Sequence, residues 1–90
     1  MKEIDELVAT LEIVSDAVNE KNSEKGFEAV TVFLVQYMDV FGHSPEIVTK
    51  TMPILEQLKD FIRSGAYDDA YPIVLALLAK LRSASKLSEE

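Results

Sequence analysis

The stretch from Tyr67 to Leu81, YDDAYPIVLALLAKL, constrains the fold of this chain more than any other. Every residue from Ile73 to Ala79 is apolar, so this segment needs neighbours that remove it from water. A chain of 90 residues holds one such core, because two domains would each approach the size at which a core becomes marginal. We therefore expect a single domain over residues 1–90, with this segment surrounded by the rest of the chain.

Helical periodicity accounts for the first part of the chain. Apolar residues recur there at intervals of three and four, the spacing of one face of an α-helix: Ile4, Leu7, Val8, Leu11, Val14 and Val18. The chain has only three glycines and three prolines, a composition that favours few, long elements over the many turns of an all-β fold. We predict a helix over residues 2–21.

A second helix is predicted over residues 24–41, with Asn22 or Ser23 as its N-cap. Its β-branched residues also suit a strand, but the stretch without a turn signal is long for one strand. Polar residues occupy an arc of roughly 140° of this helix, and Val32 and Val35 lie within that arc. Either this helix is central to the fold, or part of it meets another molecule.

Two further helices are predicted over residues 45–64 and 67–84. Pro45 suits the first helical position, whereas Pro53 predicts a kink or a division of the helix into two. Gly65 is a natural stop, and residues 85–90 are expected to form a frayed tail. Short loops make successive helices pack antiparallel, so the predicted fold class is all-α, an antiparallel up-down four-helix bundle.

The charge distribution argues against nucleic acid as a partner. The net charge is −7; residues 1–45 hold nine acids against three bases, and residues 46–90 hold seven against six. Binding to a phosphate backbone needs clustered Lys and Arg, which this chain lacks. No apolar run reaches the ~20 residues of a membrane-spanning helix, and the first residues do not resemble a signal peptide. We expect a cytoplasmic protein without an integral membrane segment.

Signatures of enzymes, cofactors and metal sites are absent from the sequence. The chain has no cysteine, so it cannot form a Cys-His set. His43 is the only histidine, so any Ser-His-acid set would have to use it. Phosphate-binding loops and zinc or calcium spacings do not occur. We expect a protein that is not an enzyme and has no catalytic residues, no cofactor and no metal.

Two features remain as candidates for function. A line of acids, Asp5, Glu12, Asp16 and Glu20, runs along the first helix, where it is either a solvated surface or a docking strip for a basic partner. The second and fourth helices carry more apolar surface than one bundle face needs, including the aromatic residues Phe33, Tyr37, Phe41 and Tyr71. We predict a non-enzymatic protein–protein interaction module, in one form a homodimer, with these aromatic residues as anchors and the acids providing selectivity.

Two alternatives come from other classes of protein. The stretch FIRSGAYDDAYPIVLALLAKLRSASKLSEE, residues 61–90, resembles the last helices of small bacteriocin-immunity proteins. That resemblance implies a helical bundle that protects a producer cell from its own peptide toxin. The other alternative is binding of a small molecule or lipid in the bundle core, with Pro53 and Pro72 bending their helices to open a cavity.

Overall fold

The protein is a bundle of four α-helices. The computed structural model describes the backbone of residues 2–89 and the side chains of residues 3–84. The helices are α1 (Lys2–Asn19), α2 (Ser23–Phe41), α3 (Pro45–Ser64) and α4 (Tyr67–Glu89), and no strand occurs among residues 2–89. The predicted all-α four-helix fold is confirmed.

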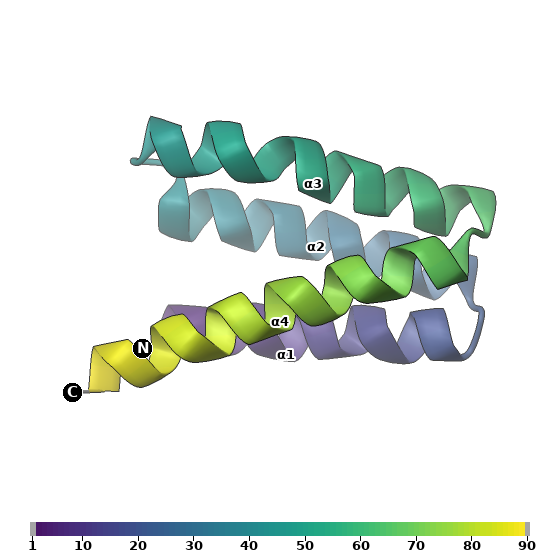
Figure 1. Ribbon diagram of the computed structural model, residues 1–90, viewed down its shortest axis with the longest axis horizontal. Coiled ribbons are helices and arrows are strands. Elements are labelled where there is room, and N and C mark those ends of the chain that lie inside the picture. The colour runs from purple at the N-terminus through teal and green to yellow at the C-terminus, as the bar shows by residue number, and fades with distance from the viewer. Residues whose placement is uncertain (1, 90) are drawn as a thin grey trace.

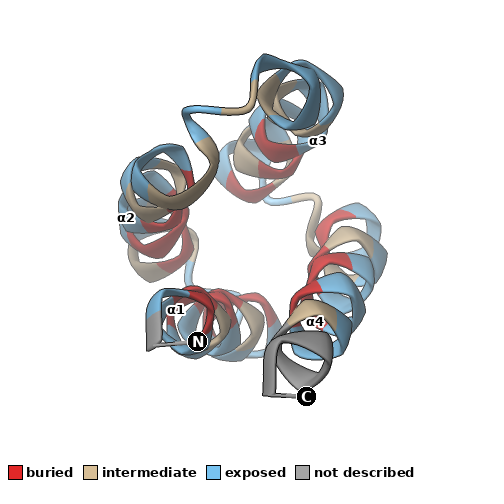
Figure 2. Cartoon of the chain, turned by 90° about the vertical axis from the view of Figure 1, so that its left-hand side faces the viewer, coloured by how far each residue is buried: buried red, intermediate tan, exposed pale blue. Residues whose placement is uncertain are grey.

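In cross-section the four helices lie at the corners of a square, and the bundle is longer than it is wide. Figure 1 shows each helix running back along the one before it, so that both ends of the chain lie at the same end of the bundle. α1 packs against α2 and α4, and α3 packs against the same two helices. The overall dimensions are 37 × 23 × 18 Å. The α1–α2 seam and the α3–α4 seam are therefore on opposite sides of the molecule (Figure 2).

One apolar core runs along the axis of the bundle. Figure 2 shows the buried residues on the sides of the helices that face the interior. The apolar run of α4 supplies Val74, Leu77, Leu78 and Leu81, as its periodicity predicted. The fully enclosed large side chains from the other three helices are Leu7, Leu11, Val14, Val30, Phe33, Leu55, Leu58 and Ile62. All four helices thus contribute to a single core.

α1 ends at Asn19, two residues before its predicted end, because the backbone reverses at Lys21. Lys21 has φ of 56°, in the left-handed region. The amide of Lys21 donates to the carbonyl of Val18 (3.1 Å), and the amide of Asn22 donates to the carbonyl of Ala17 (2.8 Å). These two bonds make a Schellman motif, which usually has glycine at the left-handed position. Because no glycine occupies this position, the sequence carries no stop signal there, and the predicted end of the helix at residue 21 was too late.

α2 begins at the predicted cap and approaches its neighbours closely. The side chain of Asn22 accepts a hydrogen bond from the amide of Lys25 (3.1 Å), which satisfies one of the free donors of the first turn. The hydroxyl of Ser23 donates to the carbonyl of Ile62 at the end of α3 (2.8 Å). A Cβ on Gly26 would lie 2.9 Å from Cγ2 of Ile62, so glycine permits this close contact.

α3 and α4 both continue through a proline. α3 is one helix from Pro45 to Ser64, so the alternative of two separate helices divided near Pro53 is wrong. Its end is the predicted one, with Gly65 in the left-handed conformation (φ of 80°). α4 continues to Glu89 instead of ending at residue 84, since the sequence after Arg82 contains neither glycine nor proline to stop it. The frayed tail predicted for residues 85–90 stays a prediction, because Glu90 and the side chains of residues 85–90 lie outside the described part.

Candidate functional site

The seam between α3 and α4 is the most open of the four seams in the bundle. Two adjacent hollows lie along it, with volumes of about 250 Å³ and about 240 Å³. They share Ile54 from α3 and both Leu77 and Lys80 from α4. We call the two hollows together the α3–α4 groove.

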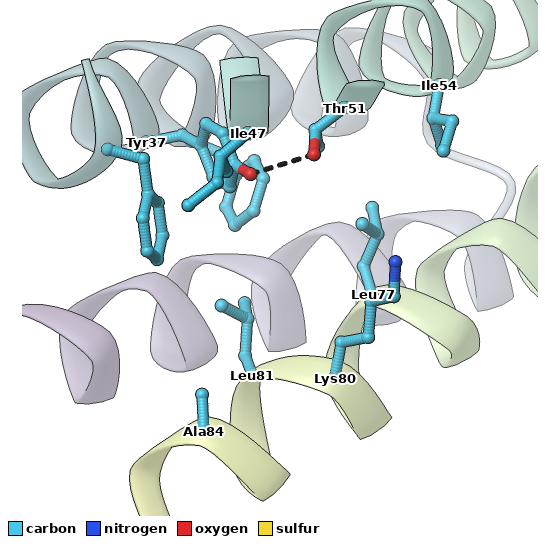
Figure 3. Close-up of a pocket in the computed structure, with 10 residues that line it drawn as sticks. Tyr37, Ile47, Thr51, Ile54, Leu77, Lys80, Leu81 and Ala84 are labelled. Carbon is cyan, nitrogen blue, oxygen red and sulfur yellow. Dashed lines mark hydrogen bonds between the residues drawn. The ribbon is translucent and has the colours of Figure 1, made fainter. Parts of the chain in front are cut away.

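The first hollow is closed on its inner side by α2. It is lined by Phe33, Tyr37 and Phe41 of α2, by Ile47, Thr51 and Ile54 of α3, and by Leu77, Lys80, Leu81 and Ala84 of α4. The second hollow lies one turn nearer to the start of α4 and is lined by Ile54, Pro72, Ile73, Ala76, Leu77 and Lys80. Figure 3 shows the α3 and α4 side chains facing one another across the first hollow. The groove is thus an apolar surface that these three helices build together.

The floor of the first hollow is a row of aromatic rings. Phe33, Tyr37 and Phe41 are four residues apart, so they lie one above another on one face of α2. The ring centroids are 6.0 Å apart for Phe33 and Tyr37 and 4.7 Å apart for Tyr37 and Phe41, both pairs being tilted. Phe33 is fully enclosed, Tyr37 is buried and Phe41 is half-buried, so exposure increases towards the end of α2.

Polar groups at the groove are few. The hydroxyl of Tyr37 donates a hydrogen bond of 2.9 Å to Oγ1 of Thr51, which joins the floor to the α3 wall (Figure 3). Among the described residues, Lys80 is the one charged side chain that lines the groove, and it lines both hollows. Figure 3 shows it extending beside Leu77 towards the α3 wall. The ammonium group forms no ion pair with any side chain of residues 3–84. An apolar group that carries a nearby negative charge therefore suits this surface.

The structure brings three of the four predicted anchors together. Phe33, Tyr37 and Phe41 line one hollow, but Tyr71 does not line the groove and is instead half-buried against the core. The contributions of α3, above all Ile54, were missed by the sequence analysis, which assigned binding to the second and fourth helices. Ile54 is an exposed large apolar side chain, but the sequence does not indicate which helix lies opposite it.

The predicted line of acids is exposed and partly paired within the chain. Asp5, Glu12 and Asp16 lie on the surface of α1, and the exposed Glu20 follows directly after its end. Glu12 accepts from the guanidinium of Arg82 at 3.1 Å, and Glu20 pairs with the ammonium of Lys25 at 3.0 Å. Arg82 and Lys80 are two residues apart on α4 and thus point about 200° apart around that helix. Glu12 and the α3–α4 groove therefore lie on different sides of α4.

Metal-binding clusters and membrane-spanning helices do not occur in the described part of the chain. Within the described residues, no three His, Cys, Asp or Glu side chains lie close enough together to bind a metal ion. His43 is exposed in the α2–α3 loop. In the same part of the chain, none of the helices has the length and apolar character needed to cross a bilayer.

Comparison with known proteins gives no relatives: no family model, no curated protein and no solved structure matches this chain. The resemblance of residues 61–90 to bacteriocin-immunity proteins thus gains no support and stays a prediction.

Proposed function

We propose that this protein is a non-enzymatic protein-interaction module whose docking site is the α3–α4 groove. The observation that supports the proposal is the convergence of Phe33, Tyr37 and Phe41 on one solvent-open apolar hollow. Aromatic residues in well-packed pockets are the usual centres of binding energy at protein interfaces. The remaining walls come from α3 and α4, so a partner would contact three helices at once.

The dimensions of the groove favour a protein segment as the occupant. Pockets for small molecules usually have volumes of roughly 300–1,000 Å³. Each hollow here is smaller, at about 250 Å³ and about 240 Å³, and the two lie in a row along α4. Along α4 one hollow is lined by residues between 72 and 80 and the other by residues between 77 and 84, a shift of about one helical turn. Side chains at positions i and i+4 of a partner helix have this spacing, and helix-in-groove recognition uses such anchors.

Site-specific photo-crosslinking in the source cell tests this proposal. A photoreactive amino acid replaces Ile54, which lines both hollows, and Leu75 serves as the matched control because it is equally apolar and exposed but does not line the groove. We expect a protein adduct from position 54 that is absent from position 75. The adduct should disappear when Lys80→Glu is introduced beside the crosslinker, because Lys80 is exposed and lines both hollows. Equal adducts at both positions, or none at position 54, would contradict the proposal.

A small apolar ligand in the first hollow is the second candidate function. A cavity of about 150 Å³ lined by apolar side chains is known to bind benzene. The first hollow, at about 250 Å³ with three aromatic rings in its wall, offers room for a ligand somewhat larger than one ring. Titration with indole, followed through the NMR signals of Ile54, Leu77 and Leu81, distinguishes the candidates. Saturable shifts confined to these residues favour a ligand, whereas unspecific shifts leave the protein partner as the proposal.

A further inference from the structure

The outer face of α2 carries apolar side chains that the bundle does not use. Val35 is 61% exposed and Val32 is 49% exposed, although both are β-branched apolar residues in a helix. Glu28 and Asp39 lie on the same face, since positions 28, 32, 35 and 39 follow the spacing of one helical stripe. We call these four residues the α2 stripe. Its two valines are the residues that fall within the polar arc of the helical wheel.

The α2 stripe and the α3–α4 groove match in length. Residues 28 and 39 are eleven positions apart, which corresponds to about 16 Å along a helix. The groove follows α4 from Pro72 to Ala84, which is about 18 Å by the same rise per residue. Val32 and Val35 lie about one turn apart on the stripe, like the two hollows on the groove.

The two surfaces also match in charge. The stripe has a carboxylate at each end, Glu28 and Asp39, and both residues are exposed. The groove has an ammonium group at the boundary of its two hollows, that of Lys80. Lys50 adds a second positive charge at its α3 edge, because it is exposed and lies on the same helical face as Ile47 and Ile54. Opposite charges of this kind favour the acidic stripe over a basic partner.

The two surfaces cannot meet within one molecule. Val32 lies at the α1–α2 seam, where it lines a shallow hollow together with Ile13 of α1. That seam is on the opposite side of the bundle from the α3–α4 seam (Figure 2). Two copies also cannot exchange both contacts in a closed pair, because each copy presents its two surfaces in opposite directions. A contact between the stripe of one copy and the groove of another is therefore heterologous, a head-to-tail contact.

We infer that the α3–α4 groove binds the α2 stripe of a second copy of this chain, so that copies associate head to tail. This inference rests on the proposed function, because it takes the groove to be a protein-docking site. One helix in one groove is a small interface, and small interfaces bind weakly. Association therefore depends on concentration and continues beyond the dimer, since each added copy leaves one groove and one stripe open.

Two complementary variants test the head-to-tail contact. The groove variant carries Ile54→Glu and Lys80→Glu and keeps its stripe. The stripe variant carries Val32→Lys and Val35→Lys and keeps its groove. All four positions are exposed, so both variants should keep the helical circular dichroism of the wild type. The control is Leu75→Lys, which removes an equally exposed apolar side chain outside both surfaces.

Sedimentation velocity over a micromolar to millimolar range gives the readout. We expect the wild type and Leu75→Lys to grow beyond dimers as concentration rises, and each surface variant alone to remain at 10.1 kDa. An equimolar mixture of the two variants should form a species of two chains and nothing larger, because only one intact groove and one intact stripe can meet. A symmetric dimer in the wild type, or a monomer at every concentration, would overturn the inference. The crosslinking result at Ile54 is independent of this outcome, so a foreign protein in that adduct would uphold the docking site while the second copy fails as its occupant.

Discussion

At the scale of single residues, residues 2–89 contain one backbone conformation that its side chain does not favour. Lys21 has a positive φ of 56° at the end of α1. An L-residue pays about 1–2 kcal/mol in this region, while glycine reaches it without steric conflict. None of the local hydrogen bonds uses the side chain of Lys21: the amides of Lys21 and Asn22 donate to α1, and the carbonyl of Lys21 accepts from the hydroxyl of Tyr67 at 3.0 Å. They survive a change of side chain.

We predict that Lys21→Gly is more stable than Lys21→Ala by about 1 kcal/mol. Both variants lose the ammonium group and its interaction with the end of α1, so their difference reports the conformational cost alone. A difference of that size corresponds to roughly 4–8 °C in the midpoint of thermal unfolding for a domain of this size. Thermal unfolding followed by circular dichroism measures it. Equal midpoints would show that alanine relieves the conformation by other means.

Gly26 presents the opposite case, where a side chain is excluded by its surroundings. Substitution by alanine improves helix propensity by up to about 1 kcal/mol. The new Cβ would lie 2.9 Å from Cγ2 of Ile62 and 3.4 Å from Cβ of Ala17, and overpacking of this kind costs about 1–3 kcal/mol. We predict a net destabilisation by Gly26→Ala in urea unfolding. The loss should shrink when Ile62→Ala is already present, because that substitution removes the clashing methyl group.

At the scale of the elements, Pro53 stands inside a continuous helix. Its nitrogen cannot donate to the carbonyl of Thr49, and an interior proline costs about 3 kcal/mol relative to alanine in a straight helix. Pro45 occupies the first position of the same helix, where the missing donor would have no partner in any case. The two prolines therefore form a matched pair within one element.

We predict that Pro53→Ala stabilises the protein by about 1–3 kcal/mol, whereas Pro45→Ala changes stability by less than about 0.5 kcal/mol. Both residues are exposed, so neither substitution opens a cavity. Urea unfolding midpoints at constant slope provide the comparison. If Pro53→Ala leaves the stability of the protein unchanged, α3 already bends enough to accommodate the proline, in agreement with the kink predicted from the sequence.

The elements also show what the sequence can and cannot predict. Apolar periodicity located all four helices, because each helix buries a single stripe and its neighbours do not alter that spacing. Helix ends were less certain where no glycine or proline marks them, as at Lys21 and after residue 84. The groove is harder still, since Ile54 and Lys80 become neighbours only once α3 lies beside α4. Phe33, Tyr37, Phe41 and Tyr71 were all predicted as aromatic members of the apolar surplus of two helices. Only the first three line the hollow, because they share one face of α2.

At the scale of the whole molecule, the acids of α1 are separated from the aromatic floor of the groove. The acids of the first half of the chain contribute most of the net charge of −7, while the groove lies between α3 and α4. Glu12 is joined to Arg82 on the far side of α4 from Lys80. Glu12 and the aromatic anchors thus lie on different sides of α4, and the use of both by one partner stays a prediction. Long-range steering by the acids remains compatible with this arrangement because it needs no contact.

The aromatic floor of the groove belongs partly to the core, so its residues differ in how much they contribute to folding. Phe33 is fully enclosed, and removal of such a side chain by Phe33→Ala costs about 3–5 kcal/mol. Total stability for a domain of this size is about 5–13 kcal/mol, so we predict that this variant loses about a quarter or more of its stability, and all of it at the lower end of that range. Phe41 lies two turns further along the same face but is half-buried, so Phe41→Ala should lose a smaller part of that stability.

These two variants therefore separate the core from the docking site. Phe41→Ala should keep the helical circular dichroism spectrum and a cooperative urea transition while it loses crosslinking at Ile54, because the outer part of the aromatic floor is gone. Phe33→Ala should lose both together. Leu55→Ala, which removes a fully enclosed side chain outside the groove, is the control for a purely structural loss. If Phe41→Ala binds as well as the wild type, the aromatic row serves the core alone, and the docking site is confined to the α3 and α4 walls.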